Sequence, residues 1–172
     1  MKNIVIIGFM ATGKSTVGRR LAQRLGRVFI DTDKEIEAVT GKTVAQIFAR
    51  DGAVRFRSEE ALLVKKLSLR EDLVIATGGG IVLDPENVRL LKKSGILVAL
   101  SASPDVIYQR TRGKKNRPLL SRGDLREKID ALLKERENIY SVADLTVNTG
   151  VCTIEESVQQ ILAFLSEREL IR

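Results

Sequence analysis

The sequence predicts an α/β fold in which helices cover both faces of a parallel β-sheet. Short apolar runs alternate with longer helical patterns along the 172-residue chain. The runs at residues 4–7 and 97–100 are purely aliphatic, as is typical of strands that are buried on both faces. A glycine-rich segment, residues 8–16, joins the first apolar run to the first helical pattern. These observations together favour a three-layer α/β/α arrangement.

The expected strands are short apolar segments that lead into glycine or a polar residue. They are predicted at residues 2–8, 28–30, 73–76, 96–100 and 145–147. In open parallel sheets, ligands bind beyond the carboxyl ends of the strands. Gly8, Asp31, Gly78 and the segment after Leu100 all lie at such ends, so we expect them to meet in one site.

The expected helices are placed by apolar spacing and by signals at their ends. They span residues 14–25, 44–49, 53–67 and 125–140, and others begin near Lys34, at Pro85, at Pro104 and after Thr153. Gly26 is expected to end the first helix in a left-handed conformation. Thr43 with Gln46, and Thr153 with Glu156, have the spacing of capping boxes. Residues 112–123 hold two glycines, a proline and many charges, and we expect a mobile loop there.

The composition restricts the chemistry and the partners. The chain has no histidine, so acid–base work falls to carboxylates, lysine or water. Its single cysteine, Cys152, cannot form an internal disulfide, and the expected compartment is the cytoplasm. No apolar run approaches the roughly 18 residues that span a bilayer. The net charge of +7 is concentrated at residues 110–126 and 50–57 without interleaved aromatic residues, so neither a membrane nor a nucleic acid is an expected partner.

The segment between the first strand and the first helix predicts a phosphate site. Residues 8–15 have the sequence GFMATGKS and match the pattern G-x-x-x-x-G-K-[ST] in full. Successive backbone N–H groups and the N-terminus of the following helix form a cradle for anions. Lys14 is expected to reach the β- and γ-phosphates, and the Ser15 hydroxyl to bind Mg²⁺. We therefore predict that this phosphate loop, residues 8–16, binds a nucleoside triphosphate and presents one phosphoryl group for transfer.

Two carboxylates, Asp31 and Asp33, alternate at the end of the second expected strand. Alternation along a strand sends them to opposite sides, so different roles are expected for them. One would face Mg²⁺, and the other would face the acceptor hydroxyl and take its proton. The alternative is that an aspartate here merely caps the helix that begins at Lys34.

Six motifs in this order and spacing resemble the shikimate kinase family. They are GFMATGKST at 8–16, DTD at 31–33, FRSEE at 56–60, TGGG at 77–80, RPLL at 117–120 and the pair Arg136 and Tyr140. The resemblance implies a fold like that of P-loop nucleoside monophosphate kinases, with a five-stranded parallel sheet. It also implies ATP as donor, Mg²⁺ as cofactor and shikimate as acceptor. Residues 1–172 would form one kinase domain, expected to be a monomer, with a substrate-binding helical segment at about 33–62 and a lid at about 112–123.

On the nucleotide side, the resemblance implies roles for residues of the loop and the lid. Arg110 would lie near the adenine, and Arg117 would close over the transferring phosphoryl group. The implied nucleotide-binding residues are Gly8, Ala11, Thr12, Gly13, Lys14, Ser15, Thr16, Arg110 and Arg117. Ala11 stands where the family often has glycine, and its methyl group should be tolerated if its backbone φ is negative.

On the acceptor side, the resemblance implies that Arg57 and Arg136 bind the shikimate carboxylate, with Glu60 holding Arg57 in place. Asp33 would contact the shikimate hydroxyls as base or orienting group, and Asp31 would join Ser15 at the metal. The implied substrate-binding residues are Asp33, Arg57, Gly78, Gly79, Gly80 and Arg136, and the implied catalytic residues are Lys14, Asp33 and Arg117.

Two other functions fit parts of the sequence. One is a different small-molecule kinase of the same fold, such as a gluconate or nucleoside monophosphate kinase. The other is a non-catalytic nucleotide-binding protein that contacts nucleic acid through its basic surface. The second is disfavoured because the set Lys14, Asp33, Arg57, Arg117 and Arg136 is intact.

Overall fold

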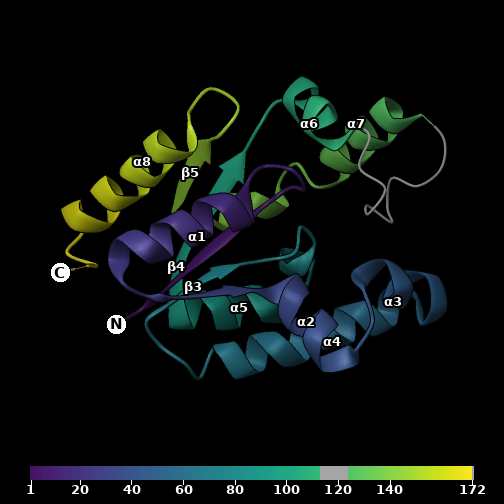
Figure 1. The fold of residues 1–172 in the computed structure, drawn as a ribbon, viewed down its shortest axis with the longest axis horizontal. Coiled ribbons are helices and arrows are strands. Elements are labelled where there is room, and N and C mark those ends of the chain that lie inside the picture. Colours follow the sequence, from purple (N-terminus) through teal and green to yellow (C-terminus); the bar gives the residue numbers. More distant parts are fainter. Residues whose placement is uncertain (113–123, 172) are drawn as a thin grey trace.

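The computed structural model describes residues 1–112 and 124–171, and within them five strands form one sheet (Figure 1). The strands are β1 (Asn3–Gly8), β2 (Val28–Asp31), β3 (Leu73–Ala76), β4 (Gly95–Ser101) and β5 (Leu145–Asn148). Their order is β2-β3-β1-β4-β5, and every neighbouring pair is parallel. The predicted α/β fold with a five-stranded parallel sheet is confirmed.

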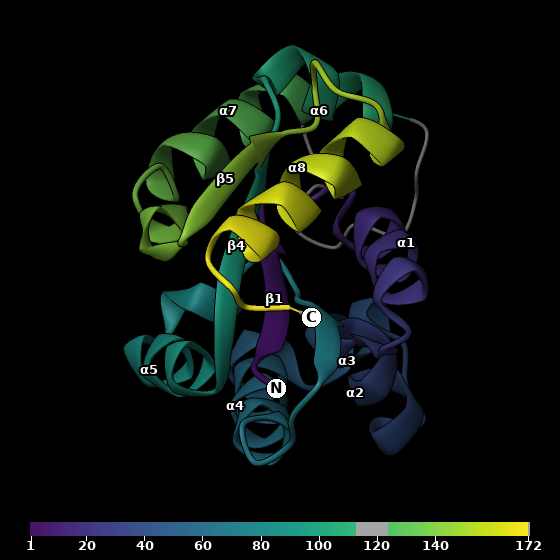
Figure 2. The ribbon, with the colours of Figure 1, turned by 90° about the vertical axis from the view of Figure 1, so that its left-hand side faces the viewer.

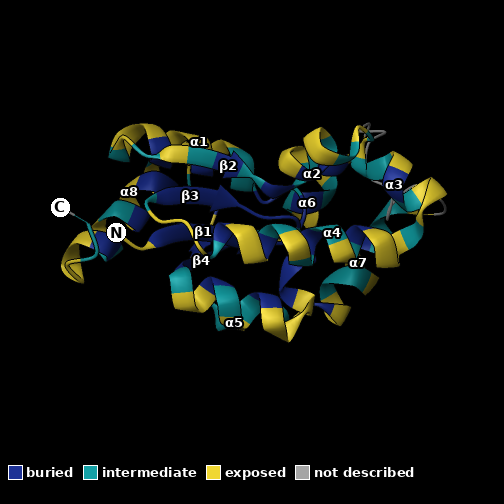
Figure 3. Cartoon of the chain, turned by 90° about the horizontal axis from the view of Figure 1, so that it is seen from below, coloured by how far each residue is buried: buried dark blue, intermediate teal, exposed yellow. Residues whose placement is uncertain are grey.

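Helices lie on both faces of this sheet. In the described residues they are α1 (Lys14–Leu25), α2 (Thr32–Thr40), α3 (Val44–Arg50), α4 (Gly52–Leu67), α5 (Pro85–Ser94), α6 (Pro104–Thr111), α7 (Leu125–Glu135) and α8 (Ile154–Glu167), with the 3-10 helices η1 (Ile81–Leu83) and η3 (Ile139–Val142). Helices α1 and α8 pack side by side against one face, whereas α4 and α5 cover the other (Figure 2 and Figure 3).

The alternation of side chains along β1 explains why both faces are covered. Ile4 and Ile6 belong to the core beneath α1 and α8, whereas Val5 and Ile7 belong to the core beneath α4 and α5. All four are at most 1% exposed, and each such side chain contributes roughly 1.5–3 kcal/mol through its burial. A strand that is apolar on both faces is stable only between two helical layers, as the sequence predicts.

The topology places the phosphate loop at a switch point of the sheet. Strand β1 pairs with β3 on one side and with β4 on the other, and the chain crosses from one side of β1 to the other between β3 and β4. Ligands in such sheets bind where the strand order reverses, beyond the carboxyl ends. The loop after β1 lies at this position.

The predicted helix ends are largely confirmed. The Thr43 hydroxyl accepts a hydrogen bond from the Gln46 N–H at 3.1 Å, and Thr153 with Glu156 forms the second capping box. Gly26 ends α1 with φ 65°.

The predicted helix at residues 125–140 is wrong at its C-terminal end. Helix α7 ends at Glu135, and Arg136 leaves the helix with φ −106° and ψ 12°. The chain then forms η3, which brings the Tyr140 hydroxyl within 2.6 Å of the Gly79 carbonyl oxygen. The apolar spacing alone did not reveal this tertiary hydrogen bond.

Residues 113–123 of the predicted lid, which include Arg117, lie outside the part of the chain that the structure describes. In the part of the chain that the structure describes, none of the helices has the length and apolarity needed to cross a membrane.

Candidate active site

The phosphate loop connects β1 to α1 with two glycines in backbone conformations that side chains disfavour. Gly8 has φ 144° and Gly13 has φ 93°, and a Cβ atom on Gly8 would collide with the carbonyl oxygen of Leu100. The Lys14 ammonium lies over the loop and donates a hydrogen bond to the Phe9 carbonyl at 2.8 Å. The loop therefore has the close backbone turn and the positive charge that a phosphate cradle requires.

Ala11 has a backbone conformation that a methyl group disfavours. Its φ is 60°, in the left-handed region, where a Cβ atom lies too close to the following carbonyl. The condition of a negative φ, under which the methyl group should be tolerated, is therefore not met, and the Ala11 carbonyl accepts a hydrogen bond from the Arg110 guanidinium at 3.1 Å.

Replacing Ala11 by glycine is expected to raise the free energy of unfolding by about 0.5–1 kcal/mol. Relief of the left-handed strain, about 1–2 kcal/mol, exceeds the extra chain entropy that glycine loses on folding. Chemical denaturation measures the change. The control is Ala131→Gly at an exposed position of α7, which should lower stability by about 1 kcal/mol. A decrease in both variants would contradict the strain argument.

Asp31 uses both of its carboxylate oxygens. Oδ1 accepts hydrogen bonds from the backbone N–H groups of Asp33 and Lys34, at 3.1 and 3.3 Å, and so caps α2. Oδ2 accepts a hydrogen bond from the Ser15 hydroxyl at 2.6 Å. The alternative in which an aspartate caps the helix is therefore correct for Asp31, yet the same side chain also faces the phosphate loop.

The expectation that Asp31 and Asp33 point to opposite sides of a strand is wrong. The strand ends at Asp31, and α2 begins at Thr32, so Asp33 lies in the first helical turn. The cap formed by Asp31 starts the helix two residues earlier than the sequence predicts. Both aspartates line the cavity beside Ser15.

The residues around Ser15 fit a magnesium ion. Mg²⁺ takes oxygen ligands and keeps several waters, with one or two protein carboxylates and substrate phosphates completing its shell. The adjacent Ser15 hydroxyl and Asp31 carboxylate provide such oxygens at the phosphate loop. Within residues 1–112 and 124–171, no cluster of three or more acidic or thiol side chains could hold a metal by itself.

Two cavities meet beside the phosphate loop. One, of about 410 Å³, surrounds the loop and reaches α6 and the segment after β5. The other, of about 560 Å³, lies between α2, α3, α4 and the glycine turn, residues 78–80. Both are lined by Met10, Ser15, Asp31, Asp33, Gly78 and Gly79. Two molecules bound in these cavities would therefore meet next to Ser15 and Asp33.

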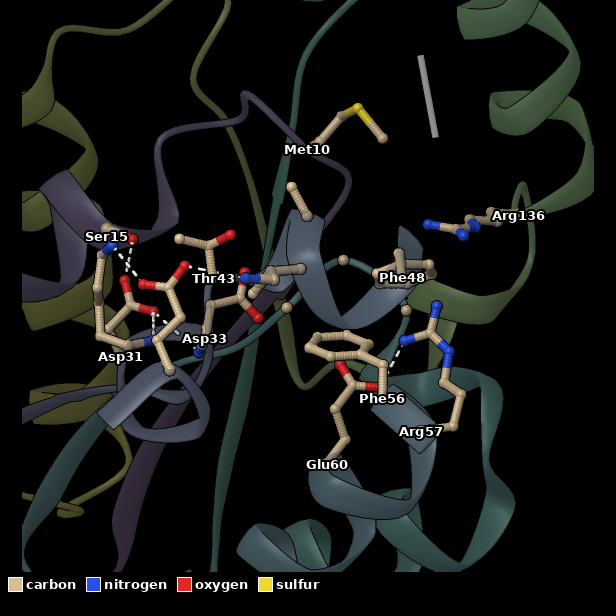
Figure 4. Close-up of a pocket in the computed structure, with 17 residues that line it drawn as sticks. Met10, Ser15, Asp31, Asp33, Thr43, Phe48, Phe56, Arg57, Glu60 and Arg136 are labelled. Carbon is tan, nitrogen blue, oxygen red and sulfur yellow. Dashed lines mark hydrogen bonds and ion pairs between the residues drawn. The ribbon is translucent and has the colours of Figure 1, made fainter. Parts of the chain in front are cut away.

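The larger cavity has opposite charges on its two sides. Figure 4 shows the carboxylates of Asp31 and Asp33 on one side and the guanidinium groups of Arg57 and Arg136 on the other. Arg136 is only 5% exposed, and its Nε has no hydrogen-bond partner among the described residues. Two guanidinium groups at one end suit a carboxylate, and an aspartate at the other end suits hydroxyl groups.

Glu60 lies beneath this cavity as a completely buried carboxyl group. One of its oxygens pairs with Arg57, and the other has no hydrogen-bond partner in the described part of the chain. Burial raises the pKa of Glu60, the nearby charge of Asp33 adds to the rise, and Arg57 opposes it, so that the pKa lies at about 7. The pair fixes Arg57 at the cavity edge.

The glycine turn leaves room for these side chains. A Cβ atom on Gly78 would lie 2.8 Å from carboxylate oxygens of both Asp33 and Glu60, and one on Gly80 would collide with the Arg57 guanidinium. The Tyr140 hydroxyl donates a hydrogen bond to the Gly79 carbonyl at 2.6 Å, and burial raises the pKa of Tyr140 to about 12. The turn is therefore held by a neutral hydrogen-bond donor from the segment that carries Arg136.

Comparison with known proteins places the chain in a family. The model of the family described as shikimate kinase matches residues 10–166. The chain belongs to the shikimate kinase family. A shikimate kinase from Pelotomaculum thermopropionicum is 67% identical over 171 residues, which cover 99% of each protein. The structure of a shikimate kinase from Acinetobacter baumannii in complex with shikimate is 41% identical, with a TM-score of 0.94 over 99% of this chain and 96% of that chain.

Other kinases share the fold at much lower identity. A gluconokinase from Sinorhizobium meliloti is 20% identical, with a TM-score of 0.62 over 96% of this chain and 92% of that chain. A likeness at this level shows a common fold alone. The family match therefore separates the chain from the other small-molecule kinases that the sequence left as alternatives.

Most residues that the resemblance to shikimate kinases implies for the site lie around the two cavities. The nucleotide-side cavity is lined by Ala11, Thr12, Gly13, Lys14, Ser15, Thr16 and Arg110, and the acceptor-side cavity by Arg57, Glu60, Gly80 and Arg136. Gly8, the first residue of the loop, is in neither lining. Arg117 lies outside the described residues.

Sequence reasoning missed the apolar wall of the acceptor-side cavity. Phe48 and Phe56 line it with ring centroids 4.9 Å apart, and Met10 lies across from them. The Arg57 guanidinium lies 5.6 Å from the centre of the Phe56 ring. In the sequence, these aromatic residues cannot be distinguished from core positions of an amphipathic helix.

Proposed function

We propose that the chain transfers the γ-phosphoryl group of ATP to the 3-hydroxyl of shikimate, giving shikimate 3-phosphate and ADP. The observation that carries this proposal is the pair of cavities joined beside the phosphate loop, with Arg57 and Arg136 facing Asp33 across the second of them. Shikimate is a small carboxylate with several hydroxyl groups, so it matches this distribution of charge. Membership of the shikimate kinase family supports the same reaction.

On the donor side, the backbone N–H groups of the phosphate loop and the Lys14 ammonium bind the phosphates. Ser15 and Asp31 would hold Mg²⁺, which neutralises charge on the phosphates when it is bound. Arg110 lines this cavity and would lie near the adenine. Arg117, which is outside the described residues, would cover the transferring phosphoryl group.

On the acceptor side, Arg57 and Arg136 bind the shikimate carboxylate, and Asp33 faces the reacting hydroxyl. The glycine turn, residues 78–80, contributes backbone N–H groups. We therefore propose that the segment at about 33–62 binds much of the substrate, together with the glycine turn and Arg136, within one kinase domain of residues 1–172. A monomer in the cytoplasm, with no nucleic-acid or membrane partner, remains our expectation.

The chemical step requires positioning more than covalent chemistry. The hydroxyl oxygen of shikimate forms a bond to the γ-phosphorus while the bond from that phosphorus to the β–γ bridging oxygen breaks, and ADP leaves. The hydroxyl proton passes to the Asp33 carboxylate. Lys14 and the loop N–H groups stabilise the charge that develops on the phosphoryl oxygens.

An acceptor panel tests the substrate assignment. ADP release from ATP and Mg²⁺ is measured with shikimate, gluconate and nucleoside monophosphates as acceptors. Shikimate should be phosphorylated with the highest kcat/KM. A higher kcat/KM for gluconate or for a nucleotide would overturn the assignment.

The Arg57→Lys substitution is expected to raise the KM for shikimate about ten- to a hundredfold, with the KM for ATP little changed. Lysine keeps the charge but cannot form the two parallel hydrogen bonds of a guanidinium to a carboxylate. Steady-state kinetics with each substrate varied in turn measures the effect. Arg55→Lys is the control, because Arg55 is an exposed residue of the same helix that pairs with Glu59 outside the two cavities. A normal shikimate affinity in Arg57→Lys would mean that the carboxylate binds elsewhere.

The buried Glu60 predicts a specific dependence of stability on pH. Its pKa is about 7 in the folded protein and 4.5 ordinarily. Between these values the folded state binds more protons than the unfolded state, so the free energy of unfolding falls as pH rises. Glu60→Gln should remove this slope, worth up to about 3 kcal/mol across the window.

Denaturant unfolding at a series of pH values measures the slope. Glu59→Gln, one residue away on α4, is the control and should keep the wild-type pH dependence. An unchanged slope in Glu60→Gln would show that another group causes it.

A further inference from the structure

We propose that Thr149 is a positioning residue for the nucleotide: with Arg110, it turns the backbone N–H groups of the phosphate loop toward the phosphates. The inference rests on the proposed use of a nucleoside triphosphate, but not on the identity of the acceptor. Thr149 follows β5, more than a hundred residues from the loop in sequence. No motif in the sequence singles it out.

The Thr149 hydroxyl is at the centre of a buried group of hydrogen bonds. The residue is 6% exposed, and its Oγ1 lies 2.7 Å from the Thr12 carbonyl oxygen and 3.2 Å from that of Ser101. A hydroxyl has one hydrogen, and the shorter contact assigns it to Thr12. The Thr149 backbone N–H donates to the Ser101 carbonyl at 2.9 Å, so the end of the sheet fixes where the hydroxyl lies.

Arg110 completes the group from α6. Its Nη1 donates to the Ala11 carbonyl and to the Thr149 hydroxyl, both at 3.1 Å, and its Nη2 donates to the Thr149 carbonyl at 2.7 Å. The carbonyls of two consecutive loop residues, Ala11 and Thr12, therefore have partners on the same side. One of the two residues, Ala11, is held in the left-handed conformation described above.

The direction of the carbonyls determines the direction of the N–H groups. In a planar trans peptide, the C=O of one residue and the N–H of the next point in opposite directions, and the described residues contain no cis peptide. Holding the carbonyls of Ala11 and Thr12 toward Thr149 and Arg110 therefore turns the N–H groups of Thr12 and Gly13 the other way. These N–H groups belong to the anion cradle. The Thr149 hydroxyl thus fixes the direction of these N–H groups before a nucleotide binds.

The same hydrogen bonds join two segments that line the nucleotide-side cavity. Thr149 is the first residue of the connection between β5 and α8. Cys152, in the same connection, also lines that cavity. The phosphate loop lines the same cavity. The hydrogen bond between Thr149 and Thr12 holds the two segments at a fixed separation. Loss of the Thr149 hydroxyl should therefore weaken the binding of ADP and ATP.

The test compares Thr149→Val with Thr149→Ser. Valine has nearly the same shape but no hydroxyl, whereas serine keeps the hydroxyl. When the hydroxyl is absent, the Thr12 carbonyl and one Arg110 N–H lose a buried hydrogen-bond partner. Thr149→Val should therefore raise the Kd for ADP about tenfold or more. Thr149→Ser should restore most of this affinity. Titration calorimetry measures the Kd directly with ADP and Mg²⁺ in the absence of any acceptor.

A purely structural role would lower the melting temperature without changing the Kd for ADP of the folded protein. The KM values give a second readout, because the KM for ATP should rise in Thr149→Val while the KM for shikimate stays within about threefold. Thr146→Val is the matched control, since Thr146 is exposed on the same strand. Thr149→Ala provides the same measurement if the valine variant does not fold.

A Kd for ADP within twofold of wild type, in folded Thr149→Val or Thr149→Ala, would overturn the proposal. This outcome is separate from a failure of the substrate assignment. If shikimate proved not to be the acceptor, the ADP titrations would still decide the role of Thr149.

Discussion

Replacing Lys14 by methionine is expected to abolish phosphoryl transfer to every acceptor, with kcat/KM reduced at least about a thousandfold. Methionine keeps much of the length of the side chain but removes its positive charge and its hydrogen-bond donors. The Lys14 ammonium now donates to the Phe9 carbonyl at the edge of the loop. We propose that from this position it binds the β- and γ-phosphates and offsets the charge that develops during transfer.

A coupled assay for ADP release measures this loss, with thermal melting to verify the fold. Lys92→Met is the control, because Lys92 is exposed on α5, away from the two cavities. Turnover of the Lys14→Met variant near the wild-type rate would mean that the loop binds the nucleotide without taking part in transfer.

The fold could be predicted in detail because its signals are local. Aliphatic runs such as residues 4–7 are stable only between two helical layers. Gly26 ends a helix through its left-handed backbone, and Thr43 and Thr153 begin helices through their side-chain hydroxyls. The errors occurred where one side chain decides between two local structures. Asp31 is both the last residue of a strand and the N-cap of a helix, and hydrophobic periodicity predicts neither of these positions.

The candidate site divides in the same way. Lys14 and Ser15 could be predicted because one contiguous motif carries them. Arg57 and Arg136 could not be predicted from their own chemistry, since nothing local distinguishes them from surface arginines; the family resemblance indicated them. Thr149 carries no motif and no resemblance identified it, because its role depends on a contact between segments far apart in the chain.

Replacing Asp33 by asparagine is expected to lower kcat about a hundred- to ten-thousandfold, while the KM for ATP changes by less than about threefold. Asp33 lies in the first turn of α2, where it lines both cavities. Asparagine has the same shape and can still hydrogen-bond to a hydroxyl, but it cannot take the proton. The substitution therefore separates proton transfer from positioning.

The control for this variant is Asp130→Asn, whose carboxylate pairs with Arg126 on the exposed side of α7. Kinetics with shikimate and ATP varied in turn locate the effect in kcat or in KM. If Asp33 acts as the base, the Asp33→Asn variant should also lose the acidic limb of its kcat profile, since no carboxylate at this position then needs to be ionised.

If Asp33 only orients the hydroxyl, the asparagine amide should preserve most of the rate and the pH profile should keep its shape. The two roles thus predict different pH profiles as well as different rates. Glu60 sharpens the comparison, because its carboxyl group lies close to Asp33 across the Gly78 position and has a pKa of about 7. An acidic limb that persists in Asp33→Asn but disappears in the double variant with Glu60→Gln would assign that limb to Glu60, and Asp33 would then be a positioning residue.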